Sequence, residues 1–124
     1  MAKFLKCKKC GKIVRVVNEG CPVLMCCGEE MVEMKANTTD AATEKHVPVI
    51  EQNGDKITVR VGSVDHPMES DHWIQWVIIE TDKGAQRKIL NPGEAPVAEF
   101  VLSGGEKLVC AYEYCNKHGL WKAV

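Results

Sequence analysis

Five of the seven cysteines in this 124-residue chain lie within its first 27 residues. Cys7 and Cys10 form a Cys-x2-Cys pair, Cys26 and Cys27 are adjacent, and a glycine follows each pair. An odd number of cysteines excludes a fully paired disulfide framework. Two short chelating turns, each relieved by a glycine, are instead typical of a tetrahedral site with four thiolate ligands. Such thiolates suit zinc and iron alike, so the spacing alone leaves both metals open.

The segment around these cysteines contains too few apolar residues to fold by itself. It offers one short predicted strand, residues 12–17, and a turn at residues 18–20. So little apolar burial cannot offset the conformational entropy lost on ordering the chain, so we expect a metal ion to be part of this small fold. Cys21 lies five positions before Cys26 and could compete as a ligand, but we expect a free thiol that packs as a small hydrophobic side chain.

The rest of the chain has the alternation of β-strands. Ile57, Val59 and Val61 alternate with polar residues, and turn residues separate runs of this kind. The pattern predicts an all-β sandwich with strands at residues 47–51, 56–61, 72–81, 86–90, 97–102 and 107–114, and a short last strand near Trp121. One weak helical turn is predicted at residues 40–44, capped by Thr39 or Asp40. We expect two domains, residues 1–36 and 37–124.

Composition excludes several classes of protein. Sixteen basic residues oppose seventeen acidic ones, which leaves no electrostatic footprint for nucleic acid. The longest apolar stretches are far shorter than the roughly 20 residues of a membrane-spanning helix. In the first six residues, MAKFLK, lysines interrupt the sequence before an apolar run typical of a secretory leader can form. We therefore expect a cytoplasmic protein.

All four histidines lie outside the cysteine-rich segment. A single histidine in a β domain is more often a core or surface group than a ligand. Here, however, they occur in three motifs: EKHVP at residues 44–48, HPME at 66–69 with His72 shortly after, and CNKHG at 115–119. These motifs are similar to those of superoxide reductases, and the cysteine spacing of roughly the first 35 residues resembles that of desulforedoxin. Together they resemble the desulfoferrodoxin family.

The resemblance implies an immunoglobulin-like β-sandwich preceded by a small desulforedoxin-like, rubredoxin-like domain. It implies two mononuclear iron ions. One would be bound by four cysteines, Cys7, Cys10, Cys26 and Cys27. The other would be held by a square of four imidazoles with an axial thiolate, from His46, His66, His72, His118 and Cys115. Its sixth position would stay open for superoxide, with Lys45 attracting the anion and aiding proton delivery and Glu44 able to occupy that position after oxidation.

The resemblance further implies reduction of superoxide to hydrogen peroxide, a rubredoxin-type electron donor and a homodimer. Three alternatives stay open: an electron carrier that works through the four cysteines, a zinc-binding interaction module, and a dismutase. Cys110 is expected to pack on the strand face opposite Cys115, together with Leu108 and Tyr112. Trp73, Trp76, Ile78 and Ile79 are expected in the core, and Trp121 either beside the site or in the core. Backbone N–H groups of Asn116 and Lys117 are expected near the axial sulfur.

Overall fold

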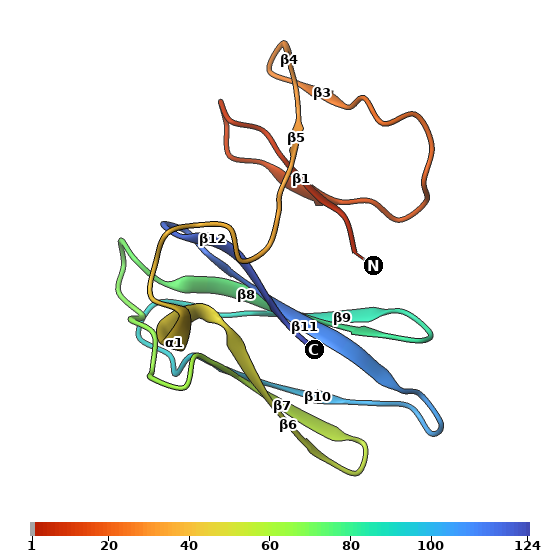
Figure 1. The fold of residues 1–124 in the computed structure, drawn as a ribbon, viewed down its shortest axis with the longest axis vertical. Helices are drawn as coiled ribbons and strands as arrows, with labels where there is room; N and C mark the ends of the chain where they lie inside the picture. Colours follow the sequence, from red (N-terminus) through yellow and green to blue (C-terminus); the bar gives the residue numbers. More distant parts are fainter. Residues whose placement is uncertain (1) are drawn as a thin grey trace. The chain divides into compact units, whose positions relative to one another are not determined.

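The computed structural model describes residues 2–124, which divide into two compact units between Lys35 and Ala36 (Figure 1). We call the first unit the head and the second the sandwich. Among the described residues, no helix is long and apolar enough to cross a membrane.

The head is a small antiparallel β structure. Strand β1 (Phe4–Lys6) lies between β2 (Ile13–Arg15) and β5 (Val32–Glu33), and β3 (Met25–Cys26) pairs with β4 (Glu29–Glu30) in a hairpin. Its core consists of Leu5, Cys7 and Met31, with Val14 and Val16 partly buried against them. The strand predicted at residues 12–17 is therefore real but shorter. So small a core agrees with a fold that depends on a bound ion.

The sandwich consists of two antiparallel sheets, ordered β10-β7-β6 and β12-β11-β8-β9. The strands are β6 (Pro48–Asn53), β7 (Lys56–Val61), β8 (Ile74–Thr81), β9 (Ala85–Ile89), β10 (Val97–Val101), β11 (Leu108–Cys115) and β12 (Gly119–Ala123). The predicted all-β sandwich is confirmed, including the last strand. β8 begins two residues later than predicted because His72 instead forms an isolated bridge with Glu69.

The sandwich core lies between the two sheets. Val59, Val77 and Ile79 are fully buried there, as strand alternation requires. The prediction that Trp73 and Trp76 belong to this core is wrong, since both are only partly buried. Trp76 points to the other face of its sheet, where its ring stacks on that of Tyr114 at 5.6 Å.

Because of a β-bulge, Leu108 lies on the opposite side of its sheet from the one predicted. The pairing of β11 with β8 shifts register between Leu108 and Cys110. As a result Leu108 packs against the inner core, on the side of Ala111, and not with Cys110 and Tyr112. Cys110 is buried and free as expected.

The one helical turn lies slightly later than predicted. Helix α1 spans Thr43–His46, and Ala42 occupies its N-cap without a side-chain hydrogen bond. Neither Thr39 nor Asp40 is the cap. The turn is held by tertiary contacts instead, because the Glu44 carbonyl accepts hydrogen bonds from Val64 N–H at 2.9 Å and Ser63 Oγ at 3.4 Å.

Candidate metal centres

The head brings four thiols together. Cys7, Cys10, Cys26 and Cys27 have sulfur atoms that all lie within 4.8 Å of one another. The Sγ of Cys26 lies 3.7 Å from that of Cys10 and 3.9 Å from that of Cys27. Four sulfurs bound at about 2.3 Å to one tetrahedral ion would be about 3.8 Å apart. The thiols are therefore spaced as ligands of a single ion.

Backbone geometry explains how so short a segment makes this cluster. Cys27 and Gly28 both adopt positive φ angles, 52° and 77°, in the turn between β3 and β4. This left-handed turn lets two adjacent cysteines direct their sulfurs to one point, and a glycine tolerates it without strain. Cys7 is buried, whereas Cys10 and Cys27 are exposed, so the cluster lies at the surface of the head.

Electrostatics in the thiol cluster favour a bound cation. The backbone N–H of Cys10 lowers the pKa of Cys7 to about 6, so this thiol ionises readily. The thiols of Cys7 and then Cys10 raise the pKa of Cys26 to about 12. Four thiolates therefore do not coexist without a positive charge between them, and a metal ion supplies that charge.

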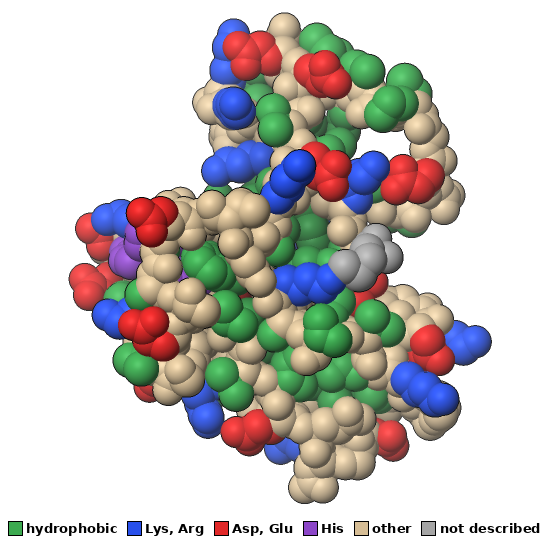
Figure 2. Space-filling view, viewed as in Figure 1, with side chains coloured by type: hydrophobic (Ala, Val, Ile, Leu, Met, Phe, Trp, Pro, Cys, Tyr) green, Lys and Arg blue, Asp and Glu red, His purple; other side chains and the backbone are tan. Residues whose placement is uncertain are grey.

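The sandwich gathers all four histidines and one cysteine. We call this set, His46, His66, His72, Cys115 and His118, the histidine–thiolate group, and its candidate ligand atoms all lie within 4.8 Å of one another. They come from the end of α1, the connection between β7 and β8, the last residue of β11 and the turn before β12. Figure 2 shows histidine side chains at one edge of this unit, among acidic and basic ones.

The four imidazoles form a closed ring. Neighbouring ring centroids are 4.7 Å apart for His46 and His66, 4.8 Å for His66 and His72, 5.1 Å for His72 and His118, and 4.8 Å for His118 and His46. The planes of neighbouring rings are inclined by 76° to 89°. The order around the ring is therefore 46, 66, 72, 118, as a square of nitrogen ligands requires.

The hydrogen bonds of the Nδ1 atoms of His46 and His66 show that the square of four imidazoles suits a cation. The Nδ1 of His46 lies 2.7 Å from the Ala42 carbonyl, and the Nδ1 of His66 lies 2.6 Å from the Pro67 carbonyl. A carbonyl only accepts, so both Nδ1 atoms carry the proton and both Nε2 atoms are bare. Yet these Nε2 atoms are only 3.1 Å apart. Two lone pairs at that distance repel unless a cation lies between them, and two nitrogens bound at about 2.1 Å and at right angles to one ion would be about 3 Å apart.

The other ring atoms agree with this interpretation. His72 Nε2 is buried and has no hydrogen-bond partner within residues 2–124. Burial lowers the pKa of His66 to about 4 and also lowers those of His46 and His72, and the like charge of neighbouring imidazoles acts in the same direction. The rings of His46, His66 and His72 are therefore neutral near pH 7, which is the state that binds metal.

Cys115 supplies the sulfur of the group. It is fully buried, and its Sγ lies 3.9 Å from His118 Nδ1. Burial raises the pKa of Cys115, while the backbone N–H groups of Lys117 and His118 act against this rise. The expectation of an N–H group near the sulfur therefore holds for Lys117 but is wrong for Asn116, whose N–H donates to the Trp73 carbonyl at 3.3 Å.

Trp121 supports the ring from one side. Its indole stacks on His46 at 4.9 Å, and its Nε1–H donates to the His118 carbonyl at 3.0 Å. Trp121 is also buried. It is therefore both a core aromatic and a neighbour of the site, so both positions predicted for it from the sequence are confirmed.

Glu44 and Lys45 are exposed on α1, immediately before His46. Gly62 fixes this turn, since a Cβ added there would lie only 2.5 Å from the Glu44 carbonyl oxygen and 2.7 Å from the Lys45 carbonyl carbon. Its φ of 82° is also one that other residues rarely adopt. Sequence reasoning missed Gly62, because its role depends on a contact distant along the chain.

Comparison with known proteins identifies the family. A family model described as Desulfoferrodoxin matches residues 38–124, and one described as Desulfoferrodoxin, N-terminal domain, matches residues 2–34. The chain belongs to the desulfoferrodoxin family. A desulfoferrodoxin of Nitratidesulfovibrio vulgaris is 52% identical over 121 residues, which cover 98% of this chain and 94% of the relative.

Two further relatives carry a functional name. A protein of Pyrococcus horikoshii named superoxide reductase is 35% identical over 74% of this chain and 95% of its own length. The crystal structure of the superoxide reductase from Treponema pallidum superposes with a TM-score of 0.85 at 35% identity, covering 100% of this chain and 99% of that one. The four-thiol cluster and the histidine–thiolate group match the two iron sites of a desulfoferrodoxin.

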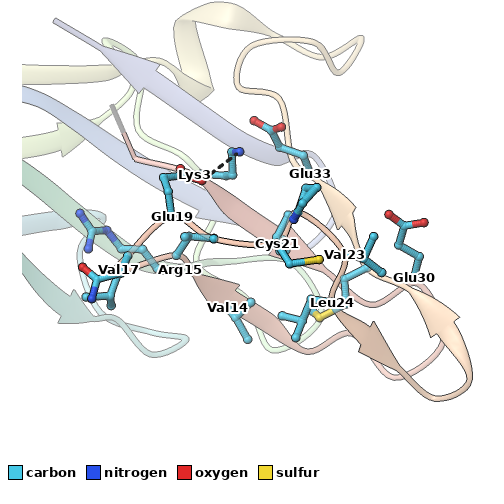
Figure 3. A pocket seen from close by; sticks show the side chains of 16 residues that line it. Lys3, Val14, Arg15, Val17, Glu19, Cys21, Val23, Leu24, Glu30 and Glu33 are labelled. Carbon is cyan, nitrogen blue, oxygen red and sulfur yellow. Dashed lines mark ion pairs between the residues drawn. The ribbon is translucent and has the colours of Figure 1, made fainter.

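Cys21 lies outside both ligand groups. It is free and exposed, so the expectation that it packs as a hydrophobic side chain is wrong. It lines a cavity of about 510 Å³ in the head, beneath the loop that joins β2 to β3 (Figure 3). Leu24 and Val14 line the same cavity. The loop curves around this space, which leaves the thiol accessible.

Glu113 is the second residue near the site that the sequence did not reveal. It is fully buried, both carboxylate oxygens lack a hydrogen-bond partner within residues 2–124, and burial raises its pKa well above the usual range. It lies two residues before Cys115 on the same face of β11, and its charge contributes to the raised pKa of that thiol. A glutamate within a strand is normally predicted to be exposed, so no local sequence pattern indicates that Glu113 is buried.

Proposed function

We propose that this protein is a cytoplasmic superoxide reductase that reduces superoxide to hydrogen peroxide. The observation that carries the proposal is the closed ring of four imidazoles with one buried thiolate beside it. Five ligands leave one position of a six-coordinate ion vacant. The names of relatives similar over most of their length support the same activity.

We assign the domains and ligands as follows. Residues 1–36 form a four-cysteine iron domain, and the division of the structure after Lys35 supports this boundary. Residues 37–124 form the reductase domain. The five members of the histidine–thiolate group hold the catalytic iron, and the four clustered thiols of the head hold the second iron. Four thiolates leave a tetrahedral ion no open position, so the head site does not contact substrate.

The chemistry is the one-electron reduction of superoxide, in which two protons are taken up and hydrogen peroxide is released. A bound iron would supply the electron, and the thiolate of Cys115 would raise the electron density available for that transfer. The neutral imidazoles hold the ion without cancelling its charge. An external donor of the rubredoxin type would supply the electron for each further turnover, and the protein acts as a homodimer.

Lys45 and Glu44 act beside the ligands. The exposed ammonium of Lys45 lies one residue before His46, close enough that its charge lowers the pKa of that ring. It attracts the superoxide anion and supplies a proton near the vacant position. Glu44 offers a carboxylate on the same turn, which is available to the vacant position when no substrate is bound. Gly62 and the hydrogen bonds to the Glu44 carbonyl keep both residues in place.

Pulse radiolysis of Lys45→Ile tests the proposal. We expect the second-order rate with superoxide to fall about tenfold or more at low ionic strength, and the difference to shrink as salt screens the charge. Iron content and visible spectrum stay as in the wild type. Lys83→Ile is the matched control, because it removes an equal charge from the turn after β8, at the end of that strand opposite His72.

Product analysis separates the reductase from its alternatives. The proposal requires two irons per chain and one peroxide for each electron taken from a donor, with no dioxygen evolved. Sustained turnover without a donor would indicate a dismutase, and a single iron held by the head would indicate an electron carrier. Either result, or an unchanged rate in Lys45→Ile, contradicts the corresponding part of the proposal.

A further inference from the structure

The side-chain amide of Asn116 strengthens the connection between two ligand-bearing segments at the point where the regular sheet ends. The pairing of β11 with β8 ends at Cys115 and Ile74, after a register shift. Beyond that point Asn116 Oδ1 accepts a hydrogen bond from the Trp73 N–H at 2.9 Å, and its Nδ2 donates to the Asp71 carbonyl at 2.9 Å. The Asn116 N–H also donates to the Trp73 carbonyl at 3.3 Å, so the side chain adds two hydrogen bonds to a single remaining backbone bond.

The two backbone groups that it binds flank a single ligand. Asp71 and Trp73 are the residues on either side of His72, so the amide spans this histidine. Asn116 itself follows Cys115 and precedes His118 by two residues. The contact thus fixes the position of His72 relative to Cys115 and His118, although more than forty residues of chain separate His72 from them.

His72, which is half-buried, needs this support more than the buried His46 and His66 do. His46 and His66 are each oriented by a hydrogen bond from Nδ1 to a nearby carbonyl. The His72 ring makes no such bond within the described part of the chain, where its contacts are with the rings of His66 and His118. Its direction therefore depends on the backbone at residues 71–73. The bridge to Glu69 holds this backbone at His72, and the Asn116 amide holds it at the residues on either side.

We infer that Asn116 is a positioning residue of the histidine–thiolate group, whose amide sets the placement of His72 relative to Cys115 and His118. The position requires one donor and one acceptor on the same planar group, and an amide is the side chain that offers both in this way. Outer groups that orient metal ligands typically change metal affinity 10- to 100-fold when they are removed. The inference rests on the proposed function only in that the group binds a metal ion.

The chain contains a matched control in Asn37. Its Oδ1 accepts from the Lys122 N–H at 2.8 Å, and its Nδ2 donates to the Lys122 carbonyl at 3.2 Å. This is the same pair of amide–backbone bonds, in the same unit, but Lys122 lies in β12 and no ligand flanks it. Loss of two hydrogen bonds can thus be compared at backbone groups that flank a ligand and at a residue that does not, although Lys122 follows Trp121, which stacks on His46.

The test is cobalt(II) binding by the full chain in competition with a chelator. Asn116→Ala and Asn116→Leu are compared with Asn37→Ala and Asn37→Leu, and tryptophan fluorescence confirms folding of each variant. The four-thiolate site serves as an internal reference, because its geometry gives cobalt a different absorption. Leucine preserves the approximate size of asparagine, and two substitutions keep the comparison open if one does not fold.

We expect both Asn116 variants to bind cobalt about 10- to 100-fold more weakly at the histidine–thiolate group and to change its absorption, with the head site unaltered. Both Asn37 variants keep the wild-type affinity and absorption at the two sites. Equal affinity and absorption in the Asn116 and Asn37 variants would overturn the inference. The comparison needs no turnover, so a wild-type protein that binds two ions but does not reduce superoxide would refute the proposed function alone.

Discussion

The head and the sandwich build metal sites in opposite ways. In the head, four ligands lie on two tight turns between Cys7 and Cys27, around a buried core of three residues. In the sandwich, five ligands are spread between His46 and His118 and are brought together by the ends of strands that a dozen buried core residues hold in place. The ion therefore organises the head, whereas the core of the sandwich organises a site for the ion.

The largest expected effect concerns the ion of the head. Structural metal sites contribute roughly 10–16 kcal/mol to folding, more than the four buried apolar side chains of the head supply, which are those of Phe4, Leu5, Cys7 and Met31. We expect Cys10→Ser to lose amide protection throughout residues 2–35, as measured by hydrogen exchange with NMR detection. His66→Ala is the reciprocal control: it loses the other ion and keeps both units folded. Protected head amides in Cys10→Ser would show that our comparison is wrong.

The next effect concerns the core of the sandwich. Ile79 is fully buried, so Ile79→Ala is expected to lower the free energy of unfolding by about 2–5 kcal/mol. All three tryptophans lie after residue 36, so their fluorescence during urea unfolding reports this unit alone. In the control Ile89→Ala, the original side chain is 61% exposed, so we expect the free energy of unfolding to change by less than about 0.5 kcal/mol. If Ile79→Ala lowered the free energy of unfolding only in metal-loaded protein, the core would not be stable independently of the metal ion.

A smaller effect tests what it costs to place a carboxyl group in this core. Because burial raises the pKa of Glu113 in the folded state, the unfolded chain releases this proton at lower pH than the folded protein does. The resulting penalty is absent below about pH 4.5 and grows as pH rises towards the folded pKa. Glu113→Gln is therefore expected to stabilise the sandwich by about 1–3 kcal/mol at pH 7 and to have little effect at low pH.

The control for this substitution is Glu51→Gln. Glu51 forms an exposed ion pair with Arg60, at 3.5 Å, so its loss changes stability by less than about 1 kcal/mol. Equal effects of the two substitutions at pH 7 would mean that the buried carboxyl group carries no penalty.

The smallest effect is the pH dependence of the metal-free sandwich. The pKa of His66 is about 4 in the folded protein, against 6.5 for an ordinary histidine. The unfolded chain therefore binds this proton first, so stability is complete above pH 6.5 and falls as pH drops towards 4. We expect a loss below about 1 kcal/mol between pH 7 and 6, measured by urea titration. His66→Gln is expected to flatten the profile, and an identical profile in this variant would exclude His66 as the source.

The two units also differ in how much the sequence alone reveals. The head cysteines signal their site directly, because ligand spacing on short turns is itself the geometry. The sandwich ligands could be named only through their resemblance to a family, since no local rule brings His46 to His118. Strand alternation predicted Val59 and Ile79 inside, but it failed at Leu108, where a bulge shifts the pairing.

Other features depended on contacts far apart in the sequence. The position of α1 follows from its contacts with Gly62 and Val64 rather than from a capping residue. The burial of Glu113 and the bridging amide of Asn116 likewise arise only when distant strands meet, so composition and periodicity carry no trace of them.

Every member of the histidine–thiolate group lies at one end of the strands: before β6, between β7 and β8, at the end of β11 and before β12. The hairpin at residues 54–55 and the turn at 82–84 close the opposite end, about 20 Å or more away along strands of six to eight residues. Peptide tags, spin labels or whole fusion partners inserted at those turns would leave the reactive end untouched. The fold thus provides attachment points that are insulated from its chemistry.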